Sequence, residues 1–278
     1  MQLNLFFTFL ISGFTLIACQ PKPSSEEAIA ADAVFLKVAA YNVEYSKNAS
    51  AEEIGEAFRP FDFDVVAFSE APGGDWTKRV AAAMDMEHVL VGKHSTAGHD
   101  DKYKTIASKT PLYGYEEILM ADTLHTVTKA KTKLGDMEVE VHSVHFPFGW
   151  RDQAHIDETT NKIQTYIDNV KSHSTSALAV LMGDFNFIPS NADSLNMYHE
   201  MFKELGYELH WQDLEIDSRY INTFNALVPN DEGNGDVIDH IMYSPEKAKA
   251  VDGGILELDR PLSDHKPVWA LLEIKKMH

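Results

Sequence analysis

Residues 177–186 have the sequence Ala-Leu-Ala-Val-Leu-Met-Gly-Asp-Phe-Asn, and this stretch carries the most information about the fold. Its first six residues are all apolar, which is typical of a buried strand. The apolar run stops at Gly183, and the carboxylate of Asp184 and the amide of Asn186 follow at once. The sequence therefore predicts a buried strand that delivers polar side chains at its end.

The same pattern recurs along the chain, where apolar segments are followed by a carboxylate, an amide or an imidazole. The polar residues at these places are, in order, Asn42, Glu70, His145, Asp184 with Asn186, Asp239, and Asp264 with His265. A single polar residue at a strand end is usually a turn former or a cap. Six such places in one chain instead indicate functional side chains gathered at one rim of a rigid scaffold.

The remaining segments predict one domain in which strands and helices alternate. Further strands are expected at residues 35–41, 64–69, 88–91, 105–108, 123–133, 137–145, 237–243 and 268–274. Ser50 and Glu53 fit a capping box, which begins a short helix that must end by Pro60. Other helices are expected at residues 75–84, 152–170 and 190–205. Consecutive strand pairs favour a mixed sheet sandwich covered by helices.

Six motifs resemble, in the same order, those of the endonuclease/exonuclease/phosphatase superfamily, which includes deoxyribonuclease I, exonuclease III, neutral sphingomyelinases and inositol polyphosphate 5-phosphatases. They are Tyr41-Asn42-Val43, Phe68-Ser69-Glu70, Ser143-Val144-His145, Gly183-Asp184-Phe185-Asn186, Ile238-Asp239-His240-Ile241 and Ser263-Asp264-His265-Lys266-Pro267-Val268. The resemblance spans residues 37–274. It implies an α+β fold, a single-domain four-layer αββα sandwich with the site at one end of two packed sheets.

The resemblance also implies a role for each polar residue. The metal ligands would be Asn42, Glu70 and Asp264, and the catalytic residues His145, Asp184, Asn186, Asp239 and His265. Asp239 would pair with His265, and His145 would donate to the developing negative charge. Asp184 and Asn186 would orient the attacking water and a phosphate oxygen. Either Asp184 or His265 is chemically able to act as the general base. Carboxylate and amide oxygens suit Mg²⁺, with Mn²⁺ also possible.

These residues predict a divalent-metal-dependent phosphoester hydrolase, either a phosphodiesterase or a phosphatase, which uses an activated water. The formal net charge is −19, from 24 Lys and Arg against 43 Asp and Glu. Nucleic-acid binding depends on Lys and Arg that neutralise phosphates, so a small or lipid-linked phosphoester is favoured as substrate. An extracellular nuclease of the same fold is the alternative, and a non-catalytic binding lipoprotein is less favoured. We expect a monomer.

The first residues differ from the rest. Residues 3–18 carry no charged side chain, and their apolar run at residues 5–11 is short for a membrane span and typical of a signal peptide. Leu16-Ile17-Ala18-Cys19 resembles the lipobox of bacterial lipoproteins, although residues 1–4 carry no Lys or Arg. We expect a signal peptide at residues 1–18, a lipid on Cys19 with a flexible tether to residue 33, and a catalytic domain at residues 34–278.

This prediction places the domain outside the cytoplasm, anchored to a membrane and facing the periplasm or the cell exterior. An uncleaved anchor or a mis-assigned start is the alternative. Cys19 is the only cysteine, so neither an internal disulfide nor a cysteine-rich metal site is possible.

Four other features have two interpretations each. The aromatic residues of segment 146–151 could stack a substrate group beside Arg151, or belong to the core. The acidic, Gly-rich residues 230–236 could repel a polyanion or form a plain turn. Lys129, Lys131 and Lys133 share one strand face, for which a solvated edge is favoured over a substrate patch. His142 and His240 point to the opposite strand face from their catalytic neighbours, so packing is favoured for both.

Overall fold

The computed structural model describes residues 33–148, 153–172, 177–187, 201–217, 221–228 and 237–275. The chain divides after Ala33, and Val34–His278 is the compact unit that carries the fold. The predicted signal peptide, the predicted lipidation site Cys19 and nearly all of the predicted tether lie outside the described residues. Among the described residues, no helix combines the length and the apolar character needed to cross a membrane.

Twelve strands and four α-helices carry the described architecture. The strands are β1 (Val34–Asn42), β2 (Val65–Ala71), β3 (His88–Val91), β4 (Tyr103–Ser108), β5 (Tyr113–Leu119), β6 (Thr126–Leu134), β7 (Met137–His145), β8 (Leu178–Asp184), β9 (Glu208–Leu209), β10 (Asp239–Tyr243), β11 (Ala248–Ile255) and β12 (Val268–Ile274). The helices are α2 (Ala51–Phe58), α3 (Trp76–Ala83), α4 (Gln153–Ser172) and α6 (His210–Asp213).

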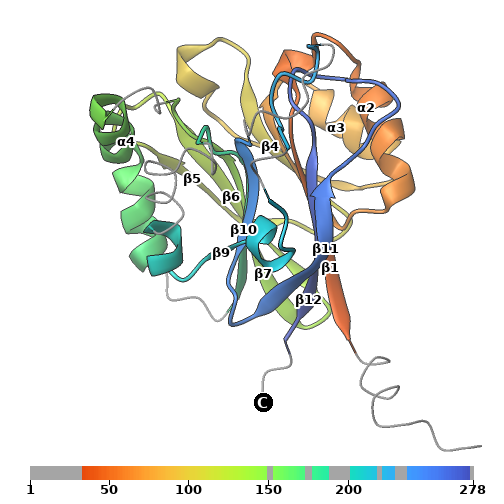
Figure 1. Cartoon of the computed structure of the whole chain (residues 1–278). Coiled ribbons are helices and arrows are strands. Elements are labelled where there is room, and N and C mark those ends of the chain that lie inside the picture. Colours follow the sequence, from red (N-terminus) through yellow and green to blue (C-terminus); the bar gives the residue numbers. More distant parts are fainter. Residues whose placement is uncertain are drawn as a thin grey trace, which may run out of the picture. The chain divides into compact units, whose positions relative to one another are not determined.

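Two mixed six-stranded sheets face one another in this unit (Figure 1). The first has the strand order β11-β12-β1-β2-β4-β3, and the second has the order β5-β6-β7-β8-β10-β9. Helices α2 and α3 cover the outer face of the first sheet, and α4 covers that of the second. The predicted four-layer αββα sandwich of the α+β class is therefore confirmed.

The inner strands β2, β7, β8 and β10 are buried on both faces, which explains the unbroken apolar runs in the sequence. One apolar cluster joins the two sheets and reaches α4, and a second lies between the first sheet and the helices α2 and α3. In β2, for example, every residue except Glu70 is buried.

The helix signals in the sequence mark the observed helix boundaries. Ser50 accepts a hydrogen bond from the backbone of Glu53, and the Glu53 side chain accepts one from the backbone of Ser50, so the capping box is confirmed. Helix α2 ends at Phe58, two residues before Pro60. Of the helix expected at residues 190–205, the described part is helical at residues 201–204, and the rest lies outside the described residues.

The interpretation of the lysines on β6 as a solvated edge is wrong for Lys129. Strand β6 lies between β5 and β7, and Lys129 is only 3% exposed. Its ammonium lies 2.7 Å from Glu116 Oε2 and 3.8 Å from Glu140 Oε2. The edge strand is instead β5, which the sequence did not predict because its polar residues interrupt the apolar alternation. The packing interpretation of His142 is confirmed, since its ring is buried within 2.8 Å of the Tyr166 hydroxyl.

Candidate active site

Strand register in the second sheet gathers three of the predicted residues. Asp184 is the last residue of β8, directly beside His145 at the end of the parallel strand β7. Asp239 lies opposite Asp184 on the antiparallel strand β10. Asp184 and His145 end their strands, whereas Asp239 is the first residue of β10. This difference arises because β10 is antiparallel to β8, so its first residue lies at the edge where β8 ends. Directly paired residues share one face of a sheet, so the three side chains project together.

Gly183 permits the close approach of β7 and β8 at this edge. Its φ is +142°, a conformation that residues with a side chain rarely adopt. A Cβ atom at this position would lie 2.1 Å from the carbonyl oxygen of Val144 on the paired strand. The glycine in the Gly-Asp-Phe-Asn motif is thus required by packing, and it fixes where Asp184 and His145 meet.

The first sheet contributes Asn42 and Glu70 from its parallel strands β1 and β2. Asn42 ends β1, and Glu70 follows Ser69, the register partner of Asn42. Glu70 has a φ of +51°, and the pairing of β2 with β4 shifts register between Phe68 and Ala71. A bulge of this kind re-aims a side chain, and it turns the Glu70 side chain toward the cavity.

Asp184 is buried at the centre of the polar cluster. Its Oδ2 accepts a hydrogen bond from Asn42 Nδ2 at 3.0 Å, and its Oδ1 accepts one from the backbone of Asn186 at 2.9 Å. Burial raises the pKa of Asp184 to about 7, although the nearby His265 opposes the shift. A carboxylate with a pKa near neutrality is suited to accept a proton during turnover.

His265 and Asp239 form the pair that the resemblance implied. His265 Nδ1 lies 2.9 Å from Asp239 Oδ2, and the Nε2 of the same ring lies 3.8 Å from Asp184 Oδ2. Burial alone would lower the pKa of His265, but the Asp239 carboxylate outweighs it and raises the pKa to about 10. The imidazolium form is therefore favoured. Thr223 Oγ1 accepts hydrogen bonds from the backbone amides of Ile238 and Asp239, which holds this carboxylate in place.

His145 and Asn186 complete the polar cluster on the second sheet. His145 Nε2 lies 3.6 Å from Asp184 Oδ2 and 3.9 Å from Glu70 Oε1, while its Nδ1 has no hydrogen-bond partner among the described residues. Burial lowers the pKa of His145 well below its usual value, so the ring is neutral. Asn186 has a φ of +52°, and its Nδ2 donates to the carbonyl of Phe146 at 2.8 Å.

A cavity of about 410 Å³ opens beside this cluster. It is lined by Glu70, His145, Phe148, Asp184, Asn186, Phe224, Asn225, Ile238, Asp264 and His265. Six of the eight predicted residues are in this lining, and the other two contact it through hydrogen bonds from Asn42 to Asp184 and from His265 to Asp239. The structure therefore brings all eight together, whereas their individual roles stay predictions.

The cavity also has apolar walls that the sequence did not single out. Phe224 forms an isolated bridge with His265, and the two ring centroids are 5.1 Å apart. Phe148, which belongs to the aromatic segment considered for stacking, lines the cavity with 46% of its surface exposed, whereas Phe146 is buried in the core. Arg151 and residues 230–236 lie outside the described residues. No local sequence signal identifies Phe224, because its place depends on the fold of a long connection.

Two groups of side chains could hold a cation. Asp184, Asp239 and His265 each offer a ligand atom within 4.8 Å of the others. In this triad the His265 ring is already paired with Asp239, whose Oδ2 lies 2.9 Å from Nδ1. Glu70 and Asp264 also face the cavity and offer the oxygen ligands that Mg²⁺ and Mn²⁺ prefer. Both groups are candidates for a divalent ion, and the assignment of the metal ligands stays a prediction.

The predicted ligand Asn42 is turned differently from Glu70 and Asp264. Its Oδ1 accepts a hydrogen bond from the backbone of Glu44 at 3.0 Å, so its amide nitrogen faces Glu70 and Asp184. In this orientation Asn42 positions the two carboxylates. Burial raises the pKa of the Asp264 carboxyl group, which accepts a hydrogen bond from Ser263 Oγ at 3.1 Å.

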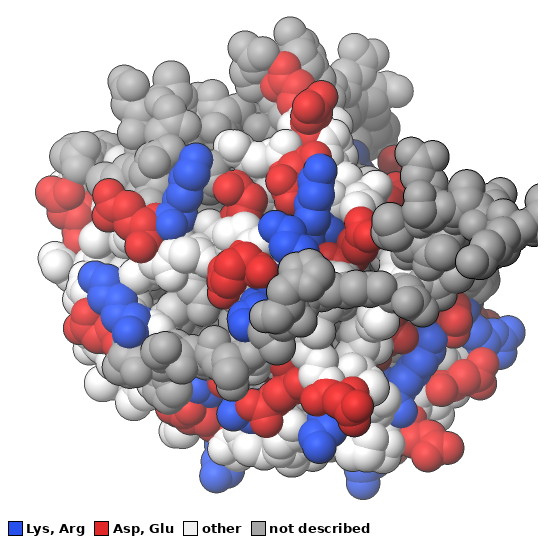
Figure 2. All heavy atoms as spheres, turned by 90° about the horizontal axis from the view of Figure 1, so that it is seen from below, with Lys and Arg blue, Asp and Glu red and all other residues white. Residues whose placement is uncertain are grey.

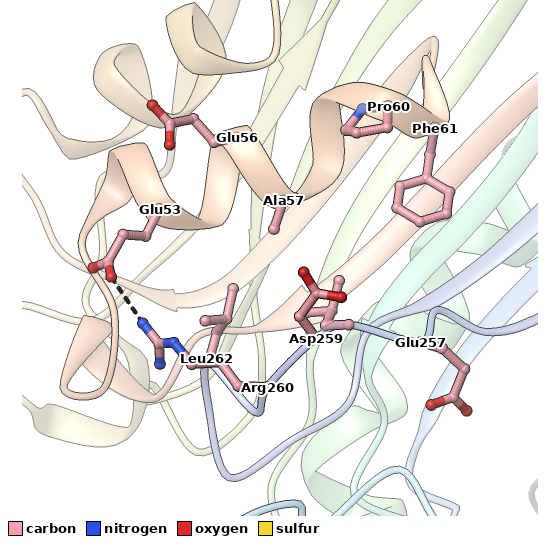
Figure 3. A pocket seen from close by; sticks show the side chains of 10 residues that line it. Glu53, Glu56, Ala57, Pro60, Phe61, Glu257, Asp259, Arg260 and Leu262 are labelled. Atoms are coloured by element: carbon pink, nitrogen blue, oxygen red, sulfur yellow. Dashed lines mark hydrogen bonds and ion pairs between the residues drawn. The ribbon is translucent and has the colours of Figure 1, made fainter.

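A second cavity, of about 500 Å³, lies between α2 and residues 257–262 (Figure 3). Glu53, Glu56, Glu257 and Asp259 line it together with apolar residues. Arg260 reaches across to Glu53 at 2.8 Å, which ties the two sides together. This cavity shares no lining residue with the first one and contains none of the eight predicted residues.

Comparison with known proteins gives a family and a set of related folds. The profile described as "Endonuclease/Exonuclease/phosphatase family" matches residues 39–265. An endonuclease/exonuclease/phosphatase from Beutenbergia cavernae has 18% sequence identity and a TM-score of 0.72, over 87% of this chain and 72% of that chain. An AP endonuclease from Archaeoglobus fulgidus has 15% identity and a TM-score of 0.65, over 84% and 98%.

Truncated TDP2 from Caenorhabditis elegans is similar at 14% identity and a TM-score of 0.63, over 86% of this chain and 98% of that chain. At identities this low, the structural likeness concerns the fold. No curated protein matches the sequence.

Proposed function

The chain belongs to the endonuclease/exonuclease/phosphatase family, and on this premise we propose that it hydrolyses phosphoesters with the help of a divalent metal ion. The observation that carries the proposal is the meeting of polar strand ends from both sheets around one cavity. Asp184 provides a proton acceptor there, with the neutral ring of His145 at 3.6 Å and the imidazolium of the His265–Asp239 pair at 3.8 Å from its Oδ2. Hydrolysis needs these three elements in place before the substrate arrives.

The metal would be held by Glu70 and Asp264, with Asn42 positioning the Glu70 carboxylate. When bound, Mg²⁺ or Mn²⁺ would neutralise charge that develops on the phosphoryl oxygens. Both ions accept carboxylate oxygens and keep some of their waters, which suits a site with few protein ligands.

The proton chemistry divides between Asp184 and His265. Their environments move the two pKa values apart, to about 7 for Asp184 and about 10 for His265. We therefore assign Asp184 as the general base that takes a proton from the attacking water. His265 then stays protonated and stabilises negative charge on the phosphate or the leaving group. His145 would donate a neutral hydrogen bond to a phosphoryl oxygen, and the backbone of Asn186 holds Asp184 in position.

The substrate proposed is a small or lipid-linked phosphoester. Phe148, Phe224 and Ile238 give the cavity an apolar side that would accept a ring or a hydrocarbon group next to the phosphate. A nuclease of the same fold is the rival, and the net charge of −19 counts against it. Figure 2 shows the molecule from below, which is the end of the sheets opposite the cavity, and on its described surface Lys and Arg are interspersed with Asp and Glu.

Export and a membrane anchor through a lipid on Cys19 also belong to the proposal. Replacing Cys19 by Ser should release the protein from the membrane fraction and prevent incorporation of a radiolabelled fatty acid. Unchanged membrane association would contradict lipidation. A monomer is expected, and sedimentation of the solubilised protein tests it.

A metal-dependent substrate panel tests the activity. The purified protein should hydrolyse a bis-aryl phosphate, a nucleotide, a sugar phosphate or sphingomyelin in the presence of Mg²⁺ or Mn²⁺, and chelation should stop turnover. Glu70→Gln, Asp184→Asn and His265→Gln should each lower kcat at least about 100-fold. Glu56→Gln, a matched loss of charge in the second cavity, should leave kcat unchanged.

If none of the substrates is cleaved with either ion, or if the three site variants turn over like the wild type, the catalytic proposal fails. The non-catalytic binding lipoprotein would then be favoured. Faster cleavage of plasmid DNA or RNA than of every small substrate would instead favour the nuclease.

A further inference from the structure

Lys102 is a charged neighbour of the site that the sequence did not single out. Its ammonium forms an ion pair with Glu70 Oε2, the side chain through which the site would bind its metal. The two side chains are 20% and 17% exposed, so the pair is largely shielded from water. Shielding strengthens such a pair, because solvent screens it less than it screens a pair on the open surface.

The backbone of Lys102 is fixed on both sides. Its amide donates to Ser95 Oγ at 2.8 Å, and its carbonyl accepts from the amide of Thr96 at 2.6 Å. The preceding residue, Asp101, accepts hydrogen bonds from the backbone of Gly73 at 3.0 Å and from the hydroxyl of Tyr45 at 3.1 Å. These contacts tie the segment before β4 to the connections that follow β1 and β2. The backbone from which the Lys102 side chain extends to Glu70 is therefore held in place by hydrogen bonds to neighbouring segments.

The pairing divides the two oxygens of the Glu70 carboxylate. Oε2 is taken by Lys102, while Oε1 faces the cavity, 3.5 Å from Asn42 Nδ2 and 3.9 Å from His145 Nε2. The positive φ of Glu70 and the bulge in β2 hold the carboxylate in this direction. A metal that approaches from the cavity would thus meet one oxygen of Glu70, Oε1, which also accepts the hydrogen bond from Asn42.

The carboxylates around the cavity explain why a positive charge beside Glu70 matters for metal binding. Glu70, Asp184 and Asp264 line one cavity, and carboxylates held this close repel one another when no cation lies between them. Lys102 supplies a positive charge at the edge of this group. The same charge repels a divalent ion, and it removes one of the oxygens that the ion could use.

We propose that Lys102 is an internal counter-ion that leaves only Oε1 of Glu70 for the divalent ion and thereby keeps the affinity of the site for that ion low. Lys102 is a positioning residue in this account, since it acts through Glu70. The inference rests on the proposed function, because it concerns the metal of that reaction. A weakly held ion gains further ligands from the phosphate of the substrate, as is common for Mg²⁺ in phosphoryl-transfer sites.

Calorimetric titration of Mn²⁺ into the full protein without substrate tests the proposal. Lys102→Met should bind Mn²⁺ at least about 10-fold more tightly than the wild type, since each tenfold corresponds to about 1.4 kcal/mol, a small part of the repulsion removed. Lys102→Arg, which keeps the charge, should bind like the wild type. Lys102→Gln serves as the second neutral variant if Lys102→Met does not fold.

Lys47 offers a matched control. It also carries one positive charge near the site, but its ammonium pairs with Glu44 Oε1 at 2.7 Å and does not contact Glu70. Lys47→Met should change Mn²⁺ affinity less than about two-fold, because an exposed charge is screened by solvent.

Each other outcome overturns a defined part of the reasoning. If the wild type turns over substrate and binds Mn²⁺, but Lys102→Met and Lys47→Met bind it equally well, the role of Lys102 is refuted and the proposed function stands. Weaker binding by Lys102→Met would also refute it, because Lys102 would then order Glu70 for the ion. If neither Mn²⁺ nor Mg²⁺ binds to the wild type, the metal dependence itself fails, and the inference fails with it.

Discussion

Replacing Gly183 by Ala should disrupt the edge at which Asp184 and His145 meet. The new Cβ would lie 2.1 Å from the carbonyl oxygen of Val144, on the strand paired with β8. This neighbour is backbone, so it cannot rotate away as the end of a flexible side chain would. Strands β7 and β8 must therefore separate locally or the glycine must change conformation.

The expected loss in the free energy of unfolding has two parts. Forcing a side chain into a φ of +142° costs about 1–3 kcal/mol, and overpacking a filled site costs about 1–3 kcal/mol more. For a domain of this size each kcal/mol lowers Tm by roughly 2–4 °C, so Gly183→Ala should lower Tm by roughly 10 °C.

Gly135→Ala separates the two costs. Gly135 also has a positive φ, of +60°, but nothing lies within 4 Å of the Cβ that alanine would add. It should therefore lose only about 1 kcal/mol, or roughly 3 °C. Thermal unfolding followed by circular dichroism compares the two variants, and turnover is measured well below both transitions.

Two results would refute this reasoning. If Gly183→Ala lowers Tm no more than Gly135→Ala does, the close contact with Val144 has no energetic consequence. If Gly183→Ala keeps full turnover while folded, the spacing of β7 and β8 does not control the geometry of Asp184 and His145.

Three further predictions follow from buried groups and helix ends. Burial lowers the pKa of His210 from 6.5 to about 3. Between these two pH values the unfolded chain therefore binds more protons at His210 than the folded chain does. The free energy of unfolding should fall on acidification by up to about 1.4 kcal/mol per pH unit. Urea unfolding at about pH 7 and about pH 5 should show a smaller loss for His210→Gln, and equal losses would contradict the assignment. With Asp184 as the base, kcat should rise through about pH 7 and then level off, whereas a rise that continues toward pH 10 would identify His265. Ser50→Ala removes the capping box of α2 and should cost about 1 kcal/mol, with kcat unchanged; an unaltered Tm would show that the cap contributes nothing.

The sequence by itself determined which residues meet at the site. Apolar runs that stop at a carboxylate, amide or imidazole mark buried strands and their ends, and this pattern is local enough to be recognised without the fold. Ser50 and Glu53 likewise predicted the start of α2, because a capping box involves only residues close together in the sequence. The motifs and their order carry the family resemblance, and it was this resemblance that predicted the four-layer sandwich.

Only the tertiary structure decided how those residues face one another. Register makes Asp184 the shared neighbour of His145 and Asp239, and a bulge aims Glu70 at the cavity. For the same reason, the sequence did not predict the pairing of Lys102 with Glu70 or the burial of Lys129 beside the edge strand β5. Each depends on contacts between separate segments of the chain, and sequence periodicity reports the face of a strand but not its neighbour in the sheet.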